Sequence, residues 1–354
     1  MDIAELLGEL CALPGPVGFE GVVAERVKAL LEPYVDEAWI DIMGNVIGVR
    51  RCGRENAPGL LLDAHIDEIG LIVTGVEEGF LRFARLGGLD PRVIPAAGVE
   101  ILTDPPIYGV VCVLPPHVLK SDDSDKTIKI EDMYIDVGLT HDEAIKAVPQ
   151  GTPGVLAGGA RRLGENGMCG KALDDRAGVA AIIFALELLK DTRLDFDLYV
   201  MGSVQEEVGS RGAAPGAFAI SPDRCIVIDA GHAKTPDSKP AETREELGGG
   251  VIISRGPNMN SGFTELVIQT AHDSGIKHQI NVEPGGNSGT NTRAIQISRT
   301  GVATALLSIP ARYMHSANET VYISDVEDTA RLLCETVRSV QRELNANAGG
   351  GDMK

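Results

Sequence analysis

The sequence predicts an α/β protein whose main domain is interrupted by a smaller, β-rich insert. Helix and strand signals alternate over the first 68 residues and again after residue 164. Between them, residues 69–164 carry short β-type runs separated by Gly and Pro, with little helical periodicity. A chain of 354 residues with 44% hydrophobic content is long enough for two domains with sizeable cores. We therefore expect one domain from residues 1–68 plus 165–354 and a second from residues 69–164.

The amino-terminal part of the main domain is expected to contain two helices followed by strands. Residues 2–12 and 20–31 have apolar side chains at i, i+3 and i+4, and Pro33 ends the second helix. Residues 38–50 read as strands joined by a turn at Gly44-Asn45, and residues 59–67 read as a further strand.

The predicted insert contains the β-type runs "GLIVTGV", "FLRFARL", "VEILT" and "IYGVVCVL", and its charged segment 120–127 is expected to be a loop. After it, α/β alternation resumes. We expect helices over 174–190, 261–273 and 325–344, and strands over 196–203, 224–230, 278–283 and 301–309. The tail, residues 345–354, is predicted to be disordered.

Charge and cysteine content limit the classes of partner and the compartment. The chain has 51 acidic and 32 basic residues and a formal charge of -19, which would repel nucleic acid and anionic membranes. Its six cysteines include no C-x-x-C pair, as expected in a reducing compartment. The first residues lack the basic start of a secretory signal, and no apolar stretch reaches the about 18 residues of a membrane span. We expect a soluble, cytoplasmic protein without nucleic-acid or membrane partners.

Acids and histidines occur at several predicted strand ends or turns. In "DAHIDEIG", the alternation of side chains along a strand places His65 and Asp67 on one face, so that one could bind a metal while the other orients a ligand. The alternative is a histidine at a strand end whose hydrogen bonds are satisfied within the protein. Asp174 and Asp175 open a predicted helix, where acids are also ordinary caps.

The adjacent pair Glu206 and Glu207 directly follows an apolar strand, where two carboxylates repel each other and resist desolvation. A bound cation would explain the pair, with one carboxylate as ligand and the other as general base; a solvated turn is the alternative. Asp229 ends another buried-type run, where a lone carboxylate needs a partner. His315 follows a further buried strand, and its alternative is a surface loop histidine.

Taken together, these residues predict a metal centre. Ligands gather at the carboxyl ends of strands in open α/β sheets, which is where these side chains are expected. Two histidines and several carboxylates without thiolates suit zinc, cobalt or manganese. A shared carboxylate can hold two such ions about 3.5–4 Å apart, which would neutralise the crowded acids and activate water for a hydrolase.

The ordered segments "AHIDEIG", "GKALDDRAG", "VQEEVGSRG", "VIDAGHA" and "RYMHS" resemble those of the M42 family of metallo-aminopeptidases, some of whose members are labelled endoglucanases or deblocking aminopeptidases. The resemblance spans nearly the whole chain. It implies that His65 and Asp229 hold one divalent ion, that Glu207 and His315 hold a second, and that Asp174 bridges both. It further implies that Glu206 is the general base for a metal-bridging water and that Asp67 supports His65.

The resemblance also implies the architecture and the assembly. The main domain would be a zinc-peptidase-like, three-layer catalytic domain, and the insert would mediate dimerisation. Six dimers would form a hollow, tetrahedral particle of twelve subunits that admits short peptides. The substrate would be the amino-terminal peptide bond of such peptides, with the free amine close to the metals.

Some positions depart from the pattern expected of the family. Gly231 stands where Thr is frequent, Asn291 where an acid is frequent, and Ala317-Asn318 where a Pro often follows the Ser. None of these replaces a predicted ligand, so the departures bear on substrate preference. We expect His232 to be non-catalytic, and Lys171 and Arg176 to form structural ion pairs.

Two alternatives to an aminopeptidase remain open from the residues themselves. The same metals and base would serve a deacylase or a carboxypeptidase-like amide hydrolase. A non-catalytic assembly subunit stabilised by metal is the second alternative, although every predicted ligand and the base are present. Cellulose hydrolysis is disfavoured, because glucan binding calls for aromatic side chains and the chain has a single tryptophan, Trp39.

Overall fold

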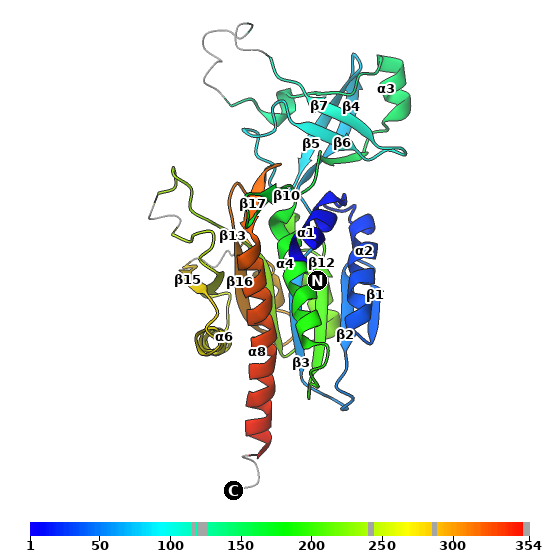
Figure 1. The fold of residues 1–354 in the computed structure, drawn as a ribbon. Coiled ribbons are helices and arrows are strands. Elements are labelled where there is room, and N and C mark those ends of the chain that lie inside the picture. Colours follow the sequence, from blue (N-terminus) through cyan, green and yellow to red (C-terminus); the bar gives the residue numbers. More distant parts are fainter. Residues whose placement is uncertain (115–117, 119–126, 240–243, 285–288, 350–354) are drawn as a thin grey trace.

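A mixed sheet of eight strands forms the centre of the larger domain in the computed structural model, which describes residues 1–114, 118, 127–239, 244–284 and 289–349 (Figure 1). In spatial order its strands are β1 (Glu37–Ile40), β2 (Val46–Arg50), β12 (Asp197–Ser203), β3 (Gly59–His65), β13 (Arg224–His232), β16 (Ala303–Ala311), β14 (Val251–Arg255) and β15 (His278–Val282).

Four neighbouring strands at the centre of this sheet, β12, β3, β13 and β16, run parallel to one another. Leu62 of β3 pairs with Val200 of β12 and with Ile226 of β13, so this register aligns the carboxyl ends of the strands. The pairs β1–β2, β2–β12 and β14–β16 are antiparallel. The carboxyl ends of the parallel strands therefore share one edge of the sheet, where the acids and histidines were predicted.

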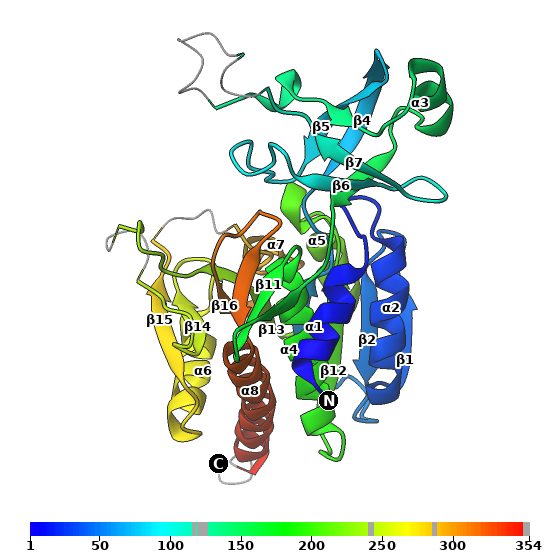
Figure 2. The same cartoon turned by 45° about the horizontal axis from the view of Figure 1, so that its top comes forward.

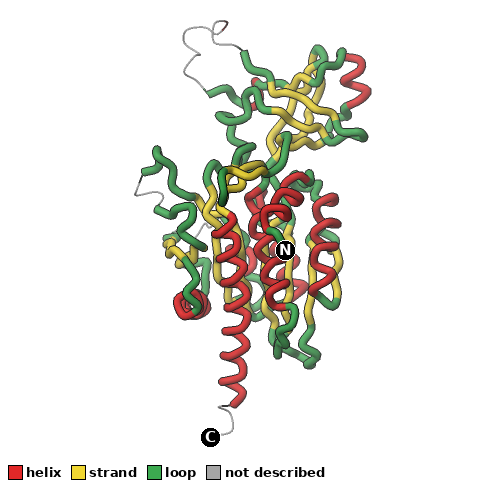
Figure 3. Tube along the Cα trace, viewed as in Figure 1, coloured by secondary structure: helices red, strands yellow, loops and turns green. Residues whose placement is uncertain are grey.

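Helices cover both faces of the sheet, as the alternation of its side chains requires. Leu60 and Leu62 of β3 belong to the core beneath one set of helices, whereas Leu61 belongs to the core on the other face. The first set is α1 (Ile3–Ala12), α2 (Gly21–Leu31), α4 (Leu173–Leu189), α6 (Ser261–Asp273) and α8 (Ile323–Gly349). The second face carries α5 (Ala213–Ile220) and α7 (Thr292–Ile295). This arrangement confirms the predicted three-layer α/β domain; Figure 3 shows the strands between the helices.

A closed barrel forms the smaller, upper part of the molecule (Figures 1 and 2). Around it the strand order is β4 (Gly70–Glu77), β5 (Phe80–Leu86), β8 (Ile135–Asp136), β7 (Ile107–Val111), β6 (Gly98–Ile101) and β9 (Pro153–Leu156). The helix α3 (His141–Ala147) packs against β4 and β5. Leu71, Leu81 and Val99 are buried in a core of the barrel's own, separate from the cores of the sheet. The inserted β-rich unit of the predicted fold class is thus present.

A short sheet lies where the two parts of the chain meet. It consists of β10 (Arg161–Leu163), β11 (Gly167–Gly170) and β17 (Glu319–Tyr322). Although β10 falls within residues 69–164, it pairs with β11 and, through it, with β17, and not with the barrel. The division of the chain at residues 68 and 165 stays a prediction.

The chain ends in a longer helix than its sequence indicated. Helix α8 continues to Gly349, so the prediction of disorder was wrong for residues 345–349. Residues 350–354 and nearly all of the predicted charged loop, 120–126, lie outside the described residues. None of the described helices has both the length and the apolar content that crossing a membrane requires.

Candidate metal centre

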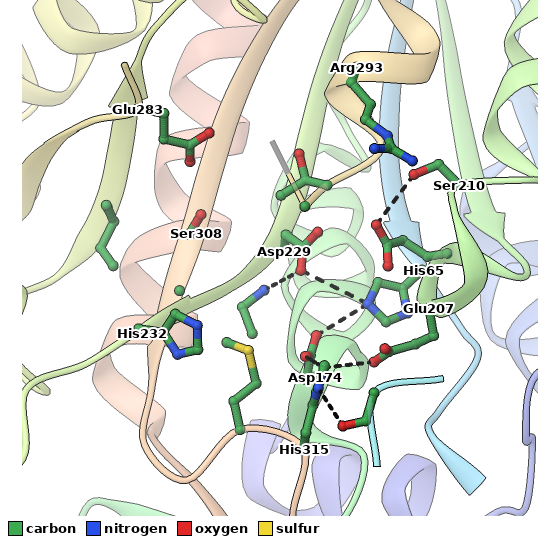
Figure 4. A pocket seen from close by; sticks show the side chains of 18 of the residues that line it. His65, Asp174, Glu207, Ser210, Asp229, His232, Glu283, Arg293, Ser308 and His315 are labelled. Carbon is green, nitrogen blue, oxygen red and sulfur yellow. Dashed lines mark hydrogen bonds and ion pairs between the residues drawn. The ribbon is translucent and has the colours of Figure 1, made fainter. Parts of the chain in front are cut away.

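The predicted ligands come together at the carboxyl edge of the parallel strands (Figure 4). His65 is the last residue of β3, and Asp229 lies near the end of β13. Glu207 belongs to the one-turn helix η4 (Glu206–Val208) that follows β12. Asp174 stands at the start of α4, and His315 follows β16. Residues up to 250 positions apart in the chain thus surround one small volume, because the sheet topology collects their strand ends.

The ligand atoms form two groups that share Asp174. One group is His65, Asp174 and Asp229, and the other is Asp174, Glu207 and His315; within each, the atoms lie within 4.8 Å of one another. Asp174 Oδ1 is 3.2 Å from His65 Nε2, whereas Asp174 Oδ2 is 3.5 Å from His315 Nε2. Each oxygen of this carboxylate therefore faces a different group, and the donor set fits two divalent ions joined by one carboxylate.

Burial makes this concentration of acids costly without cations. Asp174, Asp229 and Glu206 are all buried. Burial raises the pKa of Asp229 well above its ordinary value and the pKa of Glu206 to about 7, and the negative charge of Glu207 adds to the latter. Burial also opposes ionisation of Asp174, but hydrogen bonds with His315 and His65 hold its pKa below the ordinary range. The acids outnumber the imidazoles, and divalent ions would supply the missing positive charge.

The two acids at the start of α4 have different surroundings. Asp175 Oδ1 accepts a hydrogen bond from the N–H of Gly178 at 3.1 Å, so Asp175 acts as a helix cap. The backbone at Asp174 is not helical (φ −82°, ψ 106°), and its carboxylate lies beside His65 and His315. The capping alternative therefore applies to Asp175, and Asp174 is free to serve as a ligand.

Glu319 holds two of the candidate ligands in place through their backbone. Its Oε2 accepts the N–H of Asp174 at 3.0 Å, and its Oε1 accepts the N–H of His315 at 2.9 Å. The side chain is buried, and burial raises its pKa to about 8. Sequence reasoning missed this residue. The only signal was an acid four positions after His315 in the same segment, which by itself has many explanations.

Asp67 supports the site in two ways. Its carboxylate accepts the N–H groups of Glu206 and Glu207 at 3.0 and 3.2 Å, which fixes the turn that carries both. Its backbone oxygen lies 3.2 Å from His65 Nδ1, and its Oδ1 lies 3.6 Å from the same nitrogen. A proton on Nδ1 would be donated to the backbone oxygen of Asp67. Nε2 is then unprotonated, faces Asp174 and is able to bind a metal.

A buried ion-pair cluster lies behind the site, as predicted for Lys171 and Arg176. Lys171 Nζ is 2.8 Å from Glu68 Oε2, and Arg176 Nη2 is 3.7 Å from Glu68 Oε1. Arg176 Nε donates to the backbone oxygen of Ile66 at 2.8 Å, between His65 and Asp67. These contacts fix the segment that follows β3.

The candidate ligands line a cavity of about 520 Å³. The insert contributes Gly88, whose backbone oxygen lies 3.2 Å from His315 Nδ1. His232, which sequence reasoning set aside as non-catalytic, also lines the cavity, as does the unusual Gly231. Sequence reasoning did not single out Ser210, although it lies within "VQEEVGSRG". It also missed four lining residues that no motif marks: Glu245, Glu283, Arg293 and Ser308.

Two of the unusual positions do not line the cavity. Asn291 is buried and donates to Asp63 Oδ2 at 2.9 Å and to Ser203 Oγ at 2.8 Å. An acid at position 291 would place a second carboxyl group against buried Asp63, whereas the amide donates to it. Ala317 packs against the core of the barrel.

Comparison with known proteins identifies the family. The sequence profile described as M42 glutamyl aminopeptidase matches residues 44–332, most of the chain. The chain belongs to the M42 peptidase family. It is 36% identical over 334 residues to the lysyl aminopeptidase of Pyrococcus furiosus, an alignment that covers 93% of this chain and 94% of that protein.

Solved structures agree with this assignment. The TET aminopeptidase of a marine sediment Thaumarchaeota archaeon superposes with a TM-score of 0.90 at 31% identity, covering 96% of this chain and 98% of that one. The TET1 peptidase of Pyrococcus horikoshii, described as assembling into a tetrahedron or a large octahedral shell, gives a TM-score of 0.83 at 30% identity, covering 95% and 99%. This M42 chain is thus a metal-dependent aminopeptidase, a hydrolase that acts as an exopeptidase, as its sequence predicted.

Proposed function

We propose that this M42 aminopeptidase binds two divalent ions, zinc or cobalt, with manganese as a third candidate. His65 and Asp229 would hold one ion, Glu207 and His315 would hold the other, and Asp174 would bridge them. The observation that supports this assignment best is that the two oxygens of Asp174 face different histidines. When bound, the ions would polarise the scissile carbonyl and lower the pKa of the attacking water.

Glu206 is the proposed general base. It lies next to the ligand Glu207 but belongs to neither group of ligand atoms. Its Oε1 accepts a hydrogen bond from Ser210 Oγ at 3.4 Å, and Asp67 holds its backbone N–H. A carboxylate in this position would take the proton of the attacking water and return it to the leaving amine.

The acids that line the cavity would also favour a substrate with a free amine at its end. An ammonium group is attracted to a buried carboxylate that no metal would neutralise, such as Glu206, whereas an acylated amine carries no charge to be attracted. Peptides with free and acetylated ends separate the aminopeptidase from the deacylase alternative. We expect acetylation to abolish cleavage of the first peptide bond. Release of the acetyl group at a higher rate than cleavage of the free peptide would contradict the proposal.

Substitution of the base tests the mechanism. Glu206→Gln should lower kcat by about 10²–10⁴-fold while metal content stays at the wild-type level. The adjacent substitution Glu207→Gln serves as the contrast, because it should reduce bound metal as well. Unchanged turnover in Glu206→Gln would contradict the proposed base, and a wild-type protein without peptidase activity would favour the non-catalytic assembly subunit.

We also propose that the chain dimerises through its barrel domain and that six dimers form a tetrahedral particle. The assembly described for the P. horikoshii relative supports this proposal. Native mass spectrometry should give twelve chains of 37.4 kDa each, and a stable monomer would contradict it. Such a particle would admit short peptides, the proposed substrates. The cytoplasmic location stays a prediction.

A further inference from the structure

We propose that one arm of the cavity binds a positively charged first side chain of the substrate, of about the length of lysine. This inference rests on the proposed aminopeptidase function and names its substrate class. The arm lies against β13, β14, β15 and β16, away from Glu206. It is defined by His232, Glu245, Ile252, Asn281, Glu283 and Ser308.

Ser308 is a polar residue of this arm that the described protein groups leave available. The residue is only 5% exposed, yet it lines the cavity, and Figure 4 shows it between Glu283 and His232. Throughout the part of the chain that the structure describes, no residue hydrogen-bonds to its hydroxyl. The hydroxyl faces the cavity, so it is available to a polar group of a bound substrate.

Gly231 helps to keep this arm open. A Cβ atom at this position would lie 2.9 Å from Ile252 Cδ1 and 2.9 Å from Ser308 Cβ. A larger residue, such as the Thr that the family pattern favours, would therefore press against both side chains. Glycine leaves the surface between Ile252 and Ser308 available to a substrate.

The ionisable carboxyl groups of this arm give it a negative charge. Glu283 and Glu245 line it, and Figure 4 shows the Glu283 carboxylate directed toward the centre of the cavity. Among the described residues, neither carboxylate forms an ion pair with a basic side chain. An ammonium group has three N–H donors and no acceptor. The Glu283 carboxylate, the Ser308 hydroxyl and the Asn281 carbonyl could each accept a hydrogen bond from it. The apolar stem of a lysine side chain would pass over Ile252.

Arg293, a basic residue of the cavity, lies on the opposite side. It lies near Ser210, which hydrogen-bonds the proposed base Glu206 (Figure 4). Arg293, Gly209 and Ser210 also line a second cavity of about 570 Å³ next to α5. The leaving part of the peptide receives its proton from Glu206, so it is expected on this side. The first side chain then extends in the other direction, into the arm with Glu283.

The test compares aminoacyl-4-nitroanilides of lysine, norleucine and glutamate. Norleucine has the stem of lysine without its charge, so the ratio of kcat/KM values isolates the ammonium group. We expect the wild-type enzyme to favour lysine over norleucine by about tenfold or more, and Glu283→Gln to lower the lysine value by about tenfold while norleucine changes by less than about threefold.

Glu246→Gln is the matched control, because Glu246 adjoins Glu245 in the chain but pairs with Lys234 outside the cavity. It should leave the ratio unchanged. If Glu283→Gln is poorly folded and loses both activities, Ser308→Ala decides, and it too should lower the lysine value more than the norleucine value.

A wild-type preference for norleucine or glutamate would overturn the inference, as would an unchanged ratio in a folded Glu283→Gln or Ser308→Ala variant. Failure of the proposed function would look different, because then no aminoacyl nitroanilide would be hydrolysed, whatever its side chain.

Discussion

Glu319 illustrates how a single residue can determine the geometry of a site without touching the reacting atoms. Its two oxygens accept the backbone N–H groups of Asp174 and His315. In Glu319→Gln the amide nitrogen cannot accept a hydrogen bond, so one of these ligands loses its support. We expect metal affinity to fall by about 10–100-fold, measured by competition with a chelator.

Glu265→Gln provides the comparison for that experiment, since Glu265 is an exposed residue that pairs with Arg255 away from the cavity. It should retain wild-type affinity. Equal metal affinity in folded Glu319→Gln and wild-type protein would show that the backbone contacts do not position the ligands.

Asp63 should make stability depend on pH in a direction opposite to that of most carboxylates. Burial raises its pKa from 3.8 to about 6, although hydrogen bonds with Ser203 and Asn291 act against this shift. The folded chain therefore binds a proton more tightly than the unfolded chain. The contribution of Asp63 to stability is complete below pH 4 and is lost as pH rises through about 6, by about 3 kcal/mol.

Asp63→Asn removes this titration while its side-chain oxygen can still accept from Asn291. We expect the urea midpoint of metal-free Asp63→Asn to rise relative to the wild-type midpoint between pH 4 and pH 6, and then to stay level. Parallel pH profiles of the two proteins would exclude a raised pKa at this position.

At the residue level, sequence reasoning found the side chains that point into the site but not those that hold or surround them. Five ligands were identifiable because each lies at the boundary of a predicted element, where a polar group needs a reason to be present: His65, Asp174, Glu207, Asp229 and His315. The role of Glu319 depends on how β17 packs beside α4, and that of Glu283 on the position of β15. No local pattern encodes such packing.

Among the elements, the contact between α8 and the segment before β14 carries a prediction. Asp325 is buried near the start of α8, and its two oxygens accept the N–H groups of Gly248 and Gly250 at 2.7 and 2.9 Å. Asp325→Asn leaves one of these N–H groups without an acceptor. The free energy of unfolding should fall by about 1–3 kcal/mol, measured by urea denaturation.

Asp328→Asn changes the same type of residue one turn further along α8, where the side chain is more exposed and lies 3.8 Å from Arg331. Its effect should stay within about 0.5 kcal/mol. Similar losses in both variants would indicate that a general charge effect on the helix, rather than the two hydrogen bonds, stabilises this contact.

The long, periodic elements were predictable and the short ones were not. Helices α1, α2 and α6 match their predicted ranges within about one residue, because each has a clear apolar stripe. Helix α5 was missed, since Pro215 and Gly216 disfavour a helix in isolation. Strand β14 was also missed; it is short and surrounded by glycines. In these cases tertiary packing stabilises what local propensity does not.

For the whole molecule, the buried acids predict that metal stabilises the fold. Without cations, Asp174, Asp229 and Glu206 are buried close together in a chain that already carries a charge of -19. Ions that bind only the folded state add about 4 kcal/mol at a thousandfold excess over Kd. Chelation should therefore lower the melting temperature by several degrees, and refilling with zinc or cobalt should restore it. Identical melting curves with and without metal would contradict a dimetal centre.

The junction between barrel and sheet limits how freely the two could be exchanged between proteins. The segment that follows β5 of the barrel reaches the metal site at Gly87 and Gly88. A Cβ atom at Gly87 would lie 3.1 Å from Glu207 Cβ, and a Cβ atom at Gly88 would lie 2.4 Å from His315 Nδ1. A chimaera that replaced the barrel with a foreign module would remove the wall behind that imidazole. Grafting would therefore need to retain these two glycines along with the sheet, even if the new module folded well and paired correctly.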